Sequence, residues 1–312
     1  MNDHYSPRGR RVARRDFLRL ALGAGAVALT GDFAMAENLI RKPIPKTGEL
    51  LPAVGLGTWQ TFNVGAATSA RAPLKEVLRD FVRLGGSVLD SSPMYGKSES
   101  VAGDLAAELG AHKQLFVATK VWTSGRDAGI GQMEESFKRL RAQRIDLMQV
   151  HNLVDYRTHL ATLRAWKEQG KVRYIGVTHY TASAYDQLAR VIAAEDMDFV
   201  QLNYSLAERD AEQRLLSLAA DRRVAVLVNR PFAEGALFRK ARGKPLPSWA
   251  KEIGCASWAQ LFLKFVISHP AVTCAIPATS KVEHLVDNMQ AASGPLPDAK
   301  ARDRIARSFV DL

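Results

Sequence analysis

A single closed (β/α)8 barrel is the α/β fold that the sequence predicts, and three observations predict it. Short apolar runs that end in a polar residue alternate with longer stretches of helical periodicity. Eight such units follow residue 50, and strict alternation of strand and helix predicts a parallel sheet. The chain has 312 residues, which is long enough for one barrel of this kind. A doubly wound open sheet is the alternative architecture.

The predicted strands are the apolar runs themselves. Each run is followed by a polar residue or, in the last case, by a proline. Such runs are typical of parallel strands that are buried on both faces. The runs cover residues 53–57, 87–89, 115–119, 146–150, 174–177, 199–202, 224–228 and 273–276.

The stretches between the strands carry apolar residues at spacings of three and four, which is typical of helices that bury one face. The longest interval lies between the last two strands and contains a basic segment, residues 239–247, which we expect to form a loop on the face where the strands end. Two clear helical patterns are Leu74, Val77, Leu78, Phe81 and Val82, and then Met133, Phe137 and Leu140.

The first 36 residues are predicted to be an export signal. The apolar run 20–29 is too short to span a bilayer, which needs roughly 20 residues, and the small residues at 34–36 predict cleavage before Glu37. Residues 13–19, with two adjacent arginines, resemble the twin-arginine signal, which exports folded proteins. The resemblance implies the twin-arginine export machinery as a partner and a periplasmic or otherwise exported location. A disordered basic arm that binds nucleic acid is the alternative.

This division assigns residues 1–36 to the signal and residues 37–312 to the barrel, with no segment for stable membrane insertion after cleavage. The formal charge of +11 suits an anionic ligand, an anionic lipid or nucleic acid. Beyond the signal the basic residues are spread over the predicted helices, which argues against nucleic-acid binding. Cys255 and Cys274 match neither a zinc spacing nor a disulfide framework, so we expect buried thiols and no metal site.

Four residues with chemistry-bearing side chains are predicted to meet at the mouth of the barrel. Asp90, Lys120 and His151 follow the second, third and fourth predicted strands, and Tyr95 lies on the short loop after Asp90. Because active sites of barrels form at the carboxyl ends of the strands, we expect these side chains to converge. A barrel-mouth ion pair with a core histidine is the purely structural interpretation.

This group of residues suits the reduction of a carbonyl. A phenol has a pKa near 10 in water, so we expect the Lys120 ammonium to lower the pKa of Tyr95 and make it a proton donor. Asp90 would keep Lys120 charged. His151 would orient a carbonyl oxygen toward Tyr95 through a hydrogen bond.

The motifs around these residues resemble those of the aldo-keto reductases. They are Gly-Leu-Gly-Thr-Trp at 55–59, Asp-Ser-Ser-Pro-Met-Tyr-Gly at 90–96, Thr-Lys-Val-Trp at 119–122, the segment 145–152 and the segment 276–288. The resemblance covers about residues 45–290. It implies a (β/α)8 barrel that binds a nicotinamide dinucleotide, with Asp90, Tyr95, Lys120 and His151 as the catalytic tetrad and Tyr95 as the proton donor.

The resemblance also implies residues at the nicotinamide end of the cofactor. Gln201 matches the glutamine that binds the carboxamide, and Thr58 is assigned to the cofactor site with it. Thr178 and His179 stand where the family usually has Ser-Asn. Arg230 stands where the family often has an aromatic residue, so either stacking on the nicotinamide or binding of the pyrophosphate stays open.

At the adenine end, the resemblance places a ribose and phosphate site at a helix start, where free backbone amides favour an anion. The implied residues favour NADP(H), although His284 replaces a family arginine and leaves NAD(H) possible. They are Thr279, Ser280, Lys281, Asp287 and Asn288.

Trp59 and Trp122 match positions of the substrate pocket, with ordinary core aromatics as the alternative. The chain after Asn288 is short, which predicts an open pocket for several aldehydes or ketones. The leading hypothesis is thus an exported NAD(P)H-dependent carbonyl reductase that acts on a small molecule. The alternative is a regulatory or accessory barrel subunit that binds the cofactor without significant turnover.

Overall fold

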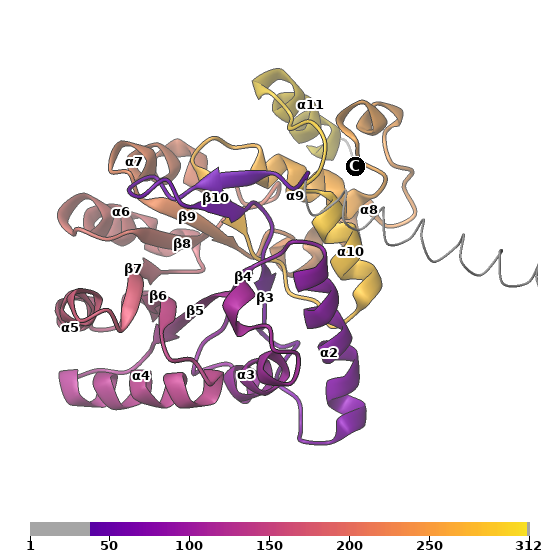
Figure 1. The fold of residues 1–312 in the computed structure, drawn as a ribbon. Coiled ribbons are helices and arrows are strands. Elements are labelled where there is room, and N and C mark those ends of the chain that lie inside the picture. Colours follow the sequence, from indigo (N-terminus) through magenta and orange to yellow (C-terminus); the bar gives the residue numbers. More distant parts are fainter. Residues whose placement is uncertain (1–37, 311–312) are drawn as a thin grey trace, which may run out of the picture.

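The computed structural model describes residues 38–310, and the predicted signal lies outside these residues. Eight parallel strands form one curled sheet in which the strands neighbour each other in chain order (Figure 1). All eight predicted strands are present, with ends shifted by a few residues. They are β3 (Leu56–Gly57), β4 (Val88–Asp90), β5 (Phe116–Val121), β6 (Ile145–Val150), β7 (Val172–Thr178), β8 (Phe199–Asn203), β9 (Ala225–Asn229) and β10 (Val272–Ala275).

The sheet closes into a barrel between its first and last strands. Val54 forms a parallel bridge with Ala275, and Gly57 forms one with Ala278. The carbonyl of Ala275 accepts a hydrogen bond of 2.8 Å from the amide of Gly55. An ideal Cβ on Gly55 would lie 2.8 Å from the carbonyl oxygen of Val88, so only glycine permits this close approach. These contacts confirm the closed barrel and exclude the open sheet.

Helices surround the barrel and bury their apolar faces against it. In α2 the residues predicted to face inward, Leu74, Val77 and Phe81, are fully buried. In α4 Met133 and Leu140 are buried as predicted. The helices are α2 (Thr68–Arg83), α3 (Ser98–Glu108), α4 (Arg126–Leu140), α5 (Tyr156–Glu168), α6 (Tyr185–Ala194), α7 (Leu215–Asp221), α8 (Ala236–Ala241), α9 (Trp258–Ile267), α10 (Val282–Gln290) and α11 (Ala299–Val310).

A short hairpin, which the sequence analysis did not predict, closes the amino-terminal end of the barrel. Strands β1 (Arg41–Pro43) and β2 (Leu50–Pro52) pair antiparallel. Ile44 and Leu51 are buried in one apolar cluster with side chains from the barrel strands, such as Phe116. The hairpin therefore fills the end of the barrel opposite the predicted active site.

The structure corrects one further expectation and confirms another. The basic segment 239–247 is not wholly a loop, because α8 extends into it as far as Ala241. Cys255 and Cys274 are free and buried, as predicted. Cys274 lies inside the barrel, where its neighbours are apolar.

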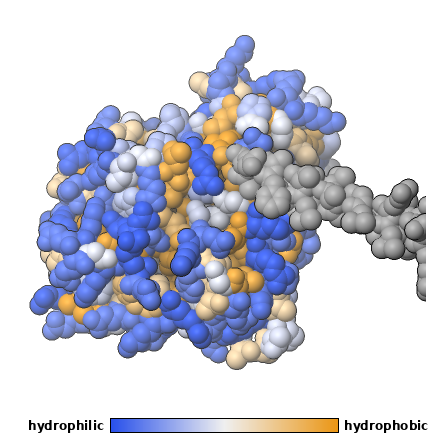
Figure 2. Space-filling view, in the orientation of Figure 1, coloured by the Kyte–Doolittle hydropathy of each residue, from blue (hydrophilic) through white to orange (hydrophobic). Residues whose placement is uncertain are grey.

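Hydrophilic residues cover most of the face seen in Figure 2, and hydrophobic residues appear between them in short stretches. Across residues 38–310, no helix has both the length and the hydrophobicity needed to cross a membrane.

Candidate active site

A cavity of about 610 Å³ opens at the carboxyl ends of the barrel strands. The last residues of several strands line it, including Gly57, Asp90, Thr178 and Asn229. Tyr95 and His151 line it too. The predicted convergence at the barrel mouth is therefore present.

Lys120 and Asp90 form a buried ion pair beneath this cavity. Lys120 Nζ lies 2.6 Å from Asp90 Oδ2 and donates a second hydrogen bond of 2.7 Å to the carbonyl of Ser91. Both residues lie within strands β4 and β5, not after them as predicted, because the strands extend one or two residues further toward the mouth. Side chains alternate along a strand, so Thr119 points out of the barrel while Lys120 points inward. The Thr119 hydroxyl donates a hydrogen bond of 2.6 Å to the carboxylate of Glu99.

The surroundings of this pair keep the ammonium charged. Burial by itself lowers the pKa of Lys120, but the Asp90 carboxylate and the Tyr95 hydroxyl raise it, and the net pKa lies above its ordinary value. The amides of Gln149 and Gln201 donate to Asp90 Oδ1 at 3.3 and 2.9 Å. These two hydrogen bonds satisfy the second carboxylate oxygen, which helps to offset the cost of burying the charge pair.

Tyr95 lies against both Lys120 and His151. Lys120 Nζ is 5.1 Å from the centre of the phenol ring, and the His151 ring is 5.9 Å away in an edge-to-face arrangement. Burial raises the pKa of Tyr95, and this outweighs the lowering by Lys120. The predicted net lowering was therefore wrong, because burial of the phenol could not be read from the sequence. Tyr95 keeps its proton, as a proton donor must.

His151 is a neutral imidazole at the start of a short 3-10 turn after β6. Its Nδ1 lies 3.0 Å from Ser92 Oγ. Burial, together with the positive charge of Lys120, lowers the pKa of His151 to about 2. At neutral pH the ring therefore presents one N–H donor and one acceptor, rather than a second positive charge.

Most of the residues predicted at the nicotinamide end and in the substrate pocket line the cavity. They include Thr58, whose hydroxyl donates to the carbonyl of Asp90 at 3.0 Å. Trp59 and Trp122 line the mouth with 41% and 43% of their surface exposed, so they are not core aromatics. The other predicted residues in the lining are Thr178, Gln201 and Arg230.

Arg230 is held at the rim of the cavity. Its guanidinium donates to the carbonyl of Tyr180 at 2.8 Å and lies 3.4 Å from a carboxylate oxygen of Glu234. A second carboxylate, that of Glu208, lies 3.9 Å away. Arg230 itself has a left-handed backbone, with φ of 51°. Two carboxylates thus partly neutralise the guanidinium, and a bound anion would compete with them for its charge.

Other predicted cofactor residues do not line this cavity. His179 Nδ1 accepts a hydrogen bond of 3.0 Å from the backbone amide of Tyr180, and the His179 ring stacks on the Tyr180 ring. Both carboxylate oxygens of Asp287 accept hydrogen bonds of 2.7 Å, from Ser257 and Gln260, which join α9 to α10. The remaining predicted residues outside the cavity lining lie just before α10 or on it. They are Thr279, Ser280, Lys281, Asp287 and Asn288.

Two asparagines in the cavity wall were not among the predicted site residues. Asn152 and Asn229 line the cavity, and the side-chain oxygen of each is buried without a hydrogen-bond partner among residues 38–310. A buried acceptor without a donor is costly, so both oxygens suit an amide N–H of a ligand. The carboxamide of a nicotinamide carries that donor, and the cavity therefore fits the implied cofactor. Their sequence signal was their place one or two residues after a predicted strand end.

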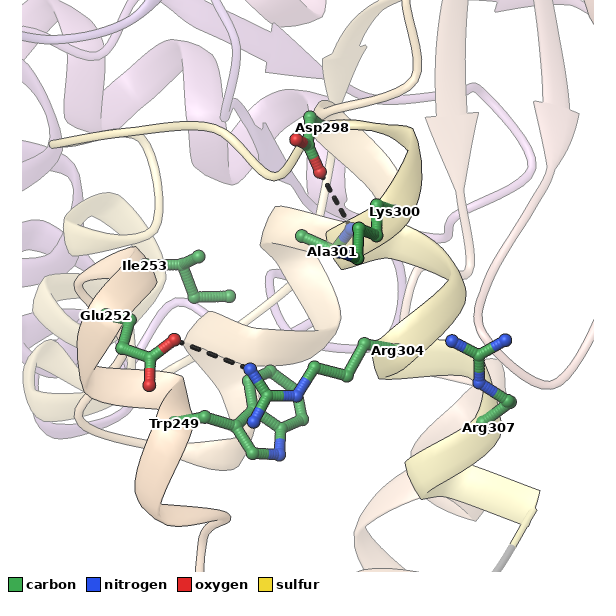
Figure 3. Close-up of a pocket in the computed structure, with 8 residues that line it drawn as sticks. All are labelled: Trp249, Glu252, Ile253, Asp298, Lys300, Ala301, Arg304 and Arg307. Atoms are coloured by element: carbon green, nitrogen blue, oxygen red, sulfur yellow. Dashed lines mark hydrogen bonds and ion pairs between the residues drawn. The ribbon is translucent and has the colours of Figure 1, made fainter.

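A second hollow, of about 370 Å³, lies between the turn 248–253 and α11 (Figure 3). The Arg304 guanidinium lies 4.5 Å from the centre of the Trp249 ring and 3.4 Å from a carboxylate oxygen of Glu252. Asp298 accepts a hydrogen bond of 2.8 Å from the amide of Ala301, at the start of α11. Arg304 and Glu252 thus form an ion pair in this hollow, and Asp298 bonds a backbone amide. None of the four tetrad residues lines it.

Comparison with known proteins identifies the family. The model of the aldo/keto reductase family matches residues 53–304. The chain is 30% identical over 258 residues to methylglyoxal reductase YeaE of Escherichia coli K12, which covers 80% of this chain and 88% of that protein. The chain belongs to the aldo/keto reductase family, and it is an oxidoreductase of aldehyde or ketone carbonyls.

Solved structures share the fold. An aldo-keto reductase from Klebsiella pneumoniae in complex with NADPH has 24% identity and a TM-score of 0.74, over 87% of this chain and 95% of that chain. The thermostable aldo-keto reductase Tm1743, in complex with the inhibitor epalrestat, has 25% identity and a TM-score of 0.72 over 87% of this chain and the whole of that chain.

Proposed function

We propose that this protein reduces aldehyde or ketone carbonyls to alcohols with NADPH, and that Tyr95 donates the proton. The observation that carries the proposal is the meeting of Asp90, Tyr95, Lys120 and His151 around one cavity. The protonated phenol, the charged lysine and the neutral histidine are the states that this chemistry needs.

The side chains of the tetrad have distinct tasks in this reaction. The nicotinamide, when bound, supplies a hydride to the carbonyl carbon of the substrate. Tyr95 donates its proton to the carbonyl oxygen, so the substrate gains one hydride and one proton and becomes an alcohol. Lys120 stabilises the phenolate that Tyr95 becomes, and Asp90 keeps Lys120 charged and in place. His151 orients the carbonyl oxygen through a hydrogen bond.

For the cofactor, we assign Thr58, Thr178 and Gln201, together with the two unsatisfied asparagines, to the nicotinamide end. Support for NADP(H) comes from relatives, since structures of aldo-keto reductase from Klebsiella pneumoniae are described in complex with NADP and with NADPH. The adenine end is assigned to Thr279, Ser280, Lys281, Asp287 and Asn288, as the family resemblance implies.

Preference for NADPH is tested by equilibrium binding. Lys281 is 61% exposed and lies 3.8 Å from Glu283, so its ammonium is accessible to a phosphate. We expect Lys281→Ala to weaken NADPH binding about tenfold and to leave NADH binding nearly unchanged. Titration of tryptophan fluorescence measures both constants without turnover. Equal binding of NADPH and NADH by the unaltered protein would contradict the preference.

Reduction itself is tested with purified residues 37–312 and a panel of aldehydes and ketones that includes methylglyoxal. We expect oxidation of NADPH, followed by absorbance, that depends on the carbonyl and disappears in Tyr95→Phe. If Tyr95→Phe binds NADPH normally, the loss belongs to proton donation. Binding of cofactor without turnover of any carbonyl by the unaltered protein would favour the accessory-subunit alternative.

We further propose that residues 1–36 direct export through the twin-arginine route. The support is the sequence pattern alone: two adjacent arginines, a short apolar run and a small-residue cleavage site. Replacement of both Arg14 and Arg15 by lysine is expected to hold the full-length protein in the cytoplasm. Cell fractionation measures this, with the mature mass in the periplasm as the expected result for the unaltered chain. An unaltered chain that stays in the cytoplasm would refute it.

A further inference from the structure

We propose that Ser92 is a positioning residue that holds His151 as the tautomer with its proton on Nε2, so that the imidazole donates a hydrogen bond to the substrate oxygen. This inference deepens the proposed carbonyl reduction and rests on it for the identity of the substrate oxygen. The tautomer itself rests on a contact between two side chains of this protein. Ser92 lies between Asp90 and Tyr95 in the chain.

The hydrogen bonds of Ser92 set the direction of the contact. Ser92 Oγ lies 3.0 Å from His151 Nδ1, and its other contact is the backbone amide of Met94 at 3.4 Å. An amide N–H only donates, so among the described residues His151 Nδ1 is the one acceptor within reach of the Ser92 hydroxyl proton. Ser92 therefore donates, and His151 Nδ1 accepts.

A hydrogen bond donated by Ser92 to Nδ1 places the ring proton of His151 on Nε2. Because burial and Lys120 keep His151 neutral, a ring that accepts at Nδ1 carries its single proton on Nε2. No hydrogen bond from residues 38–310 reaches Nε2, and His151 lines the cavity that Tyr95 also lines. The free N–H is thus available to a ligand in the cavity.

The backbone between Asp90 and Tyr95 makes the arrangement rigid. The amide of Tyr95 donates to the carbonyl of Ser92 at 3.0 Å, which closes a tight turn, and Pro93 inside it restricts the backbone. Ser92 itself is fully buried. One short turn therefore places Tyr95 and also fixes the tautomer of the second group that contacts the substrate oxygen.

The test reads the tautomer directly, with no substrate present. Protein labelled with 15N at histidine gives ring-nitrogen signals that distinguish the two neutral tautomers, and His151→Gln identifies the signal of His151 among seven histidines. We expect the Nε2–H tautomer in the unaltered protein. In Ser92→Ala we expect the Nδ1–H tautomer to become populated, since Nδ1 no longer accepts a hydrogen bond from a hydroxyl.

Kinetics then connect the tautomer to the reaction. Ser92→Ala is expected to lower kcat/KM about tenfold, the size of one lost hydrogen bond, with NADPH binding unchanged. Ser92→Thr, which keeps the hydroxyl, should restore both the tautomer and the rate. The matched control is Ser205→Ala: this serine is also fully buried, and its Oγ accepts from the amide two residues further on, at 3.3 Å, without touching an imidazole.

Two results would overturn the proposal: an Nδ1–H tautomer in the unaltered protein, or an Nε2–H tautomer that persists unchanged in Ser92→Ala. The measurement on the unaltered protein stays decisive even where a variant fails to fold. An Nε2–H ring that depends on Ser92, in a protein that reduces no carbonyl, would instead reject the proposed function and leave the role of Ser92 in fixing the tautomer standing.

Discussion

Lys120 and Lys264 are both fully buried, but the groups that surround their ammonium groups differ. Lys120, inside the barrel, is 2.6 Å from the carboxylate of Asp90, and its net pKa is raised. Lys264, on α9, donates to the backbone carbonyls of Ser293 and Pro295 at 2.6 and 2.8 Å. Burial lowers its pKa, and Cys255 raises it only in part.

The comparison shows what makes a buried lysine fit for catalysis. Carbonyl dipoles hold Lys264 in place and tie the segment after α10 to α9, but they do not offset the cost of burying the charge. A carboxylate does so for Lys120, and it leaves a full positive charge beside Tyr95. Burial alone is therefore a poor indicator of function, and the partner of the buried charge decides it.

The largest expected effect is on the rate. Lys120→Met removes the charge that stabilises the phenolate of Tyr95, and we expect kcat to fall by about 10²- to 10⁴-fold. The matched variant Lys264→Met makes the same substitution at the other buried lysine and should keep kcat within about twofold, because no tetrad residue contacts it. Steady-state kinetics with a reducible carbonyl measures both. Equal losses in the two variants would mean that burial alone explains the effect.

The second effect is on stability. Lys120→Met leaves the Asp90 carboxylate buried and unpaired, which should lower the free energy of unfolding by about 3–5 kcal/mol. The double variant Asp90→Asn/Lys120→Met should regain most of this lost stability. Its asparagine is neutral, and the asparagine oxygen can still accept hydrogen bonds from Gln149 and Gln201. Urea unfolding measures both variants. A double variant less stable than Lys120→Met would show that the carboxylate contributes without its partner.

Acid should destabilise the folded protein through His151. His151 has a pKa of about 2 in the folded protein and near 6.5 when unfolded, so between these values the unfolded chain binds more protons. The stability that His151 contributes is complete above about pH 6.5 and falls as the pH is lowered, by at most about 1.4 kcal/mol per pH unit. The difference in unfolding free energy between the unaltered protein and His151→Gln, measured from pH 4 to 7, should show this slope. A flat difference would contradict the neutral histidine.

The smallest effect separates the two lysines by the sign of their pH dependence. Lys264→Met leaves two carbonyls without their donor and should cost about 1–3 kcal/mol near pH 7. Because the folded pKa of Lys264 lies below 10.5, the unfolded chain holds more protons as the pH approaches 10.5, so the advantage of the unaltered protein over Lys264→Met should grow from pH 7 to 10.

The corresponding difference for Lys120→Met gives the control. The folded pKa of Lys120 lies above 10.5, so its contribution to stability is complete below that value and is lost only above it. Urea unfolding at pH 7, 8.5 and 10 should give a constant difference. A similar rise in both series would mean that both lysines lose their protons alike.

Much of the barrel was predictable because its interior is buried on both faces of the sheet. Buried parallel strands are short apolar runs, and all eight are found where the runs lie. The hairpin of β1 and β2 was missed, since three-residue strands that contain Pro43 and Pro52 have no local signal. It forms because Ile44 and Leu51 cover the open end of the barrel.

Some features of the candidate site were likewise predictable from the sequence, and others were not. The sequence by itself determined that Asp90, Lys120, His151 and Tyr95 would meet, because the ends of parallel strands converge in a closed barrel. Only the tertiary structure decided the direction of the pKa shift of Tyr95 and the contact between Ser92 and His151. Burial and a hydrogen bond between residues 59 positions apart produce these two properties, and neither is encoded in local spacing. Strand order follows from pattern, whereas pKa values follow from what surrounds each group in three dimensions.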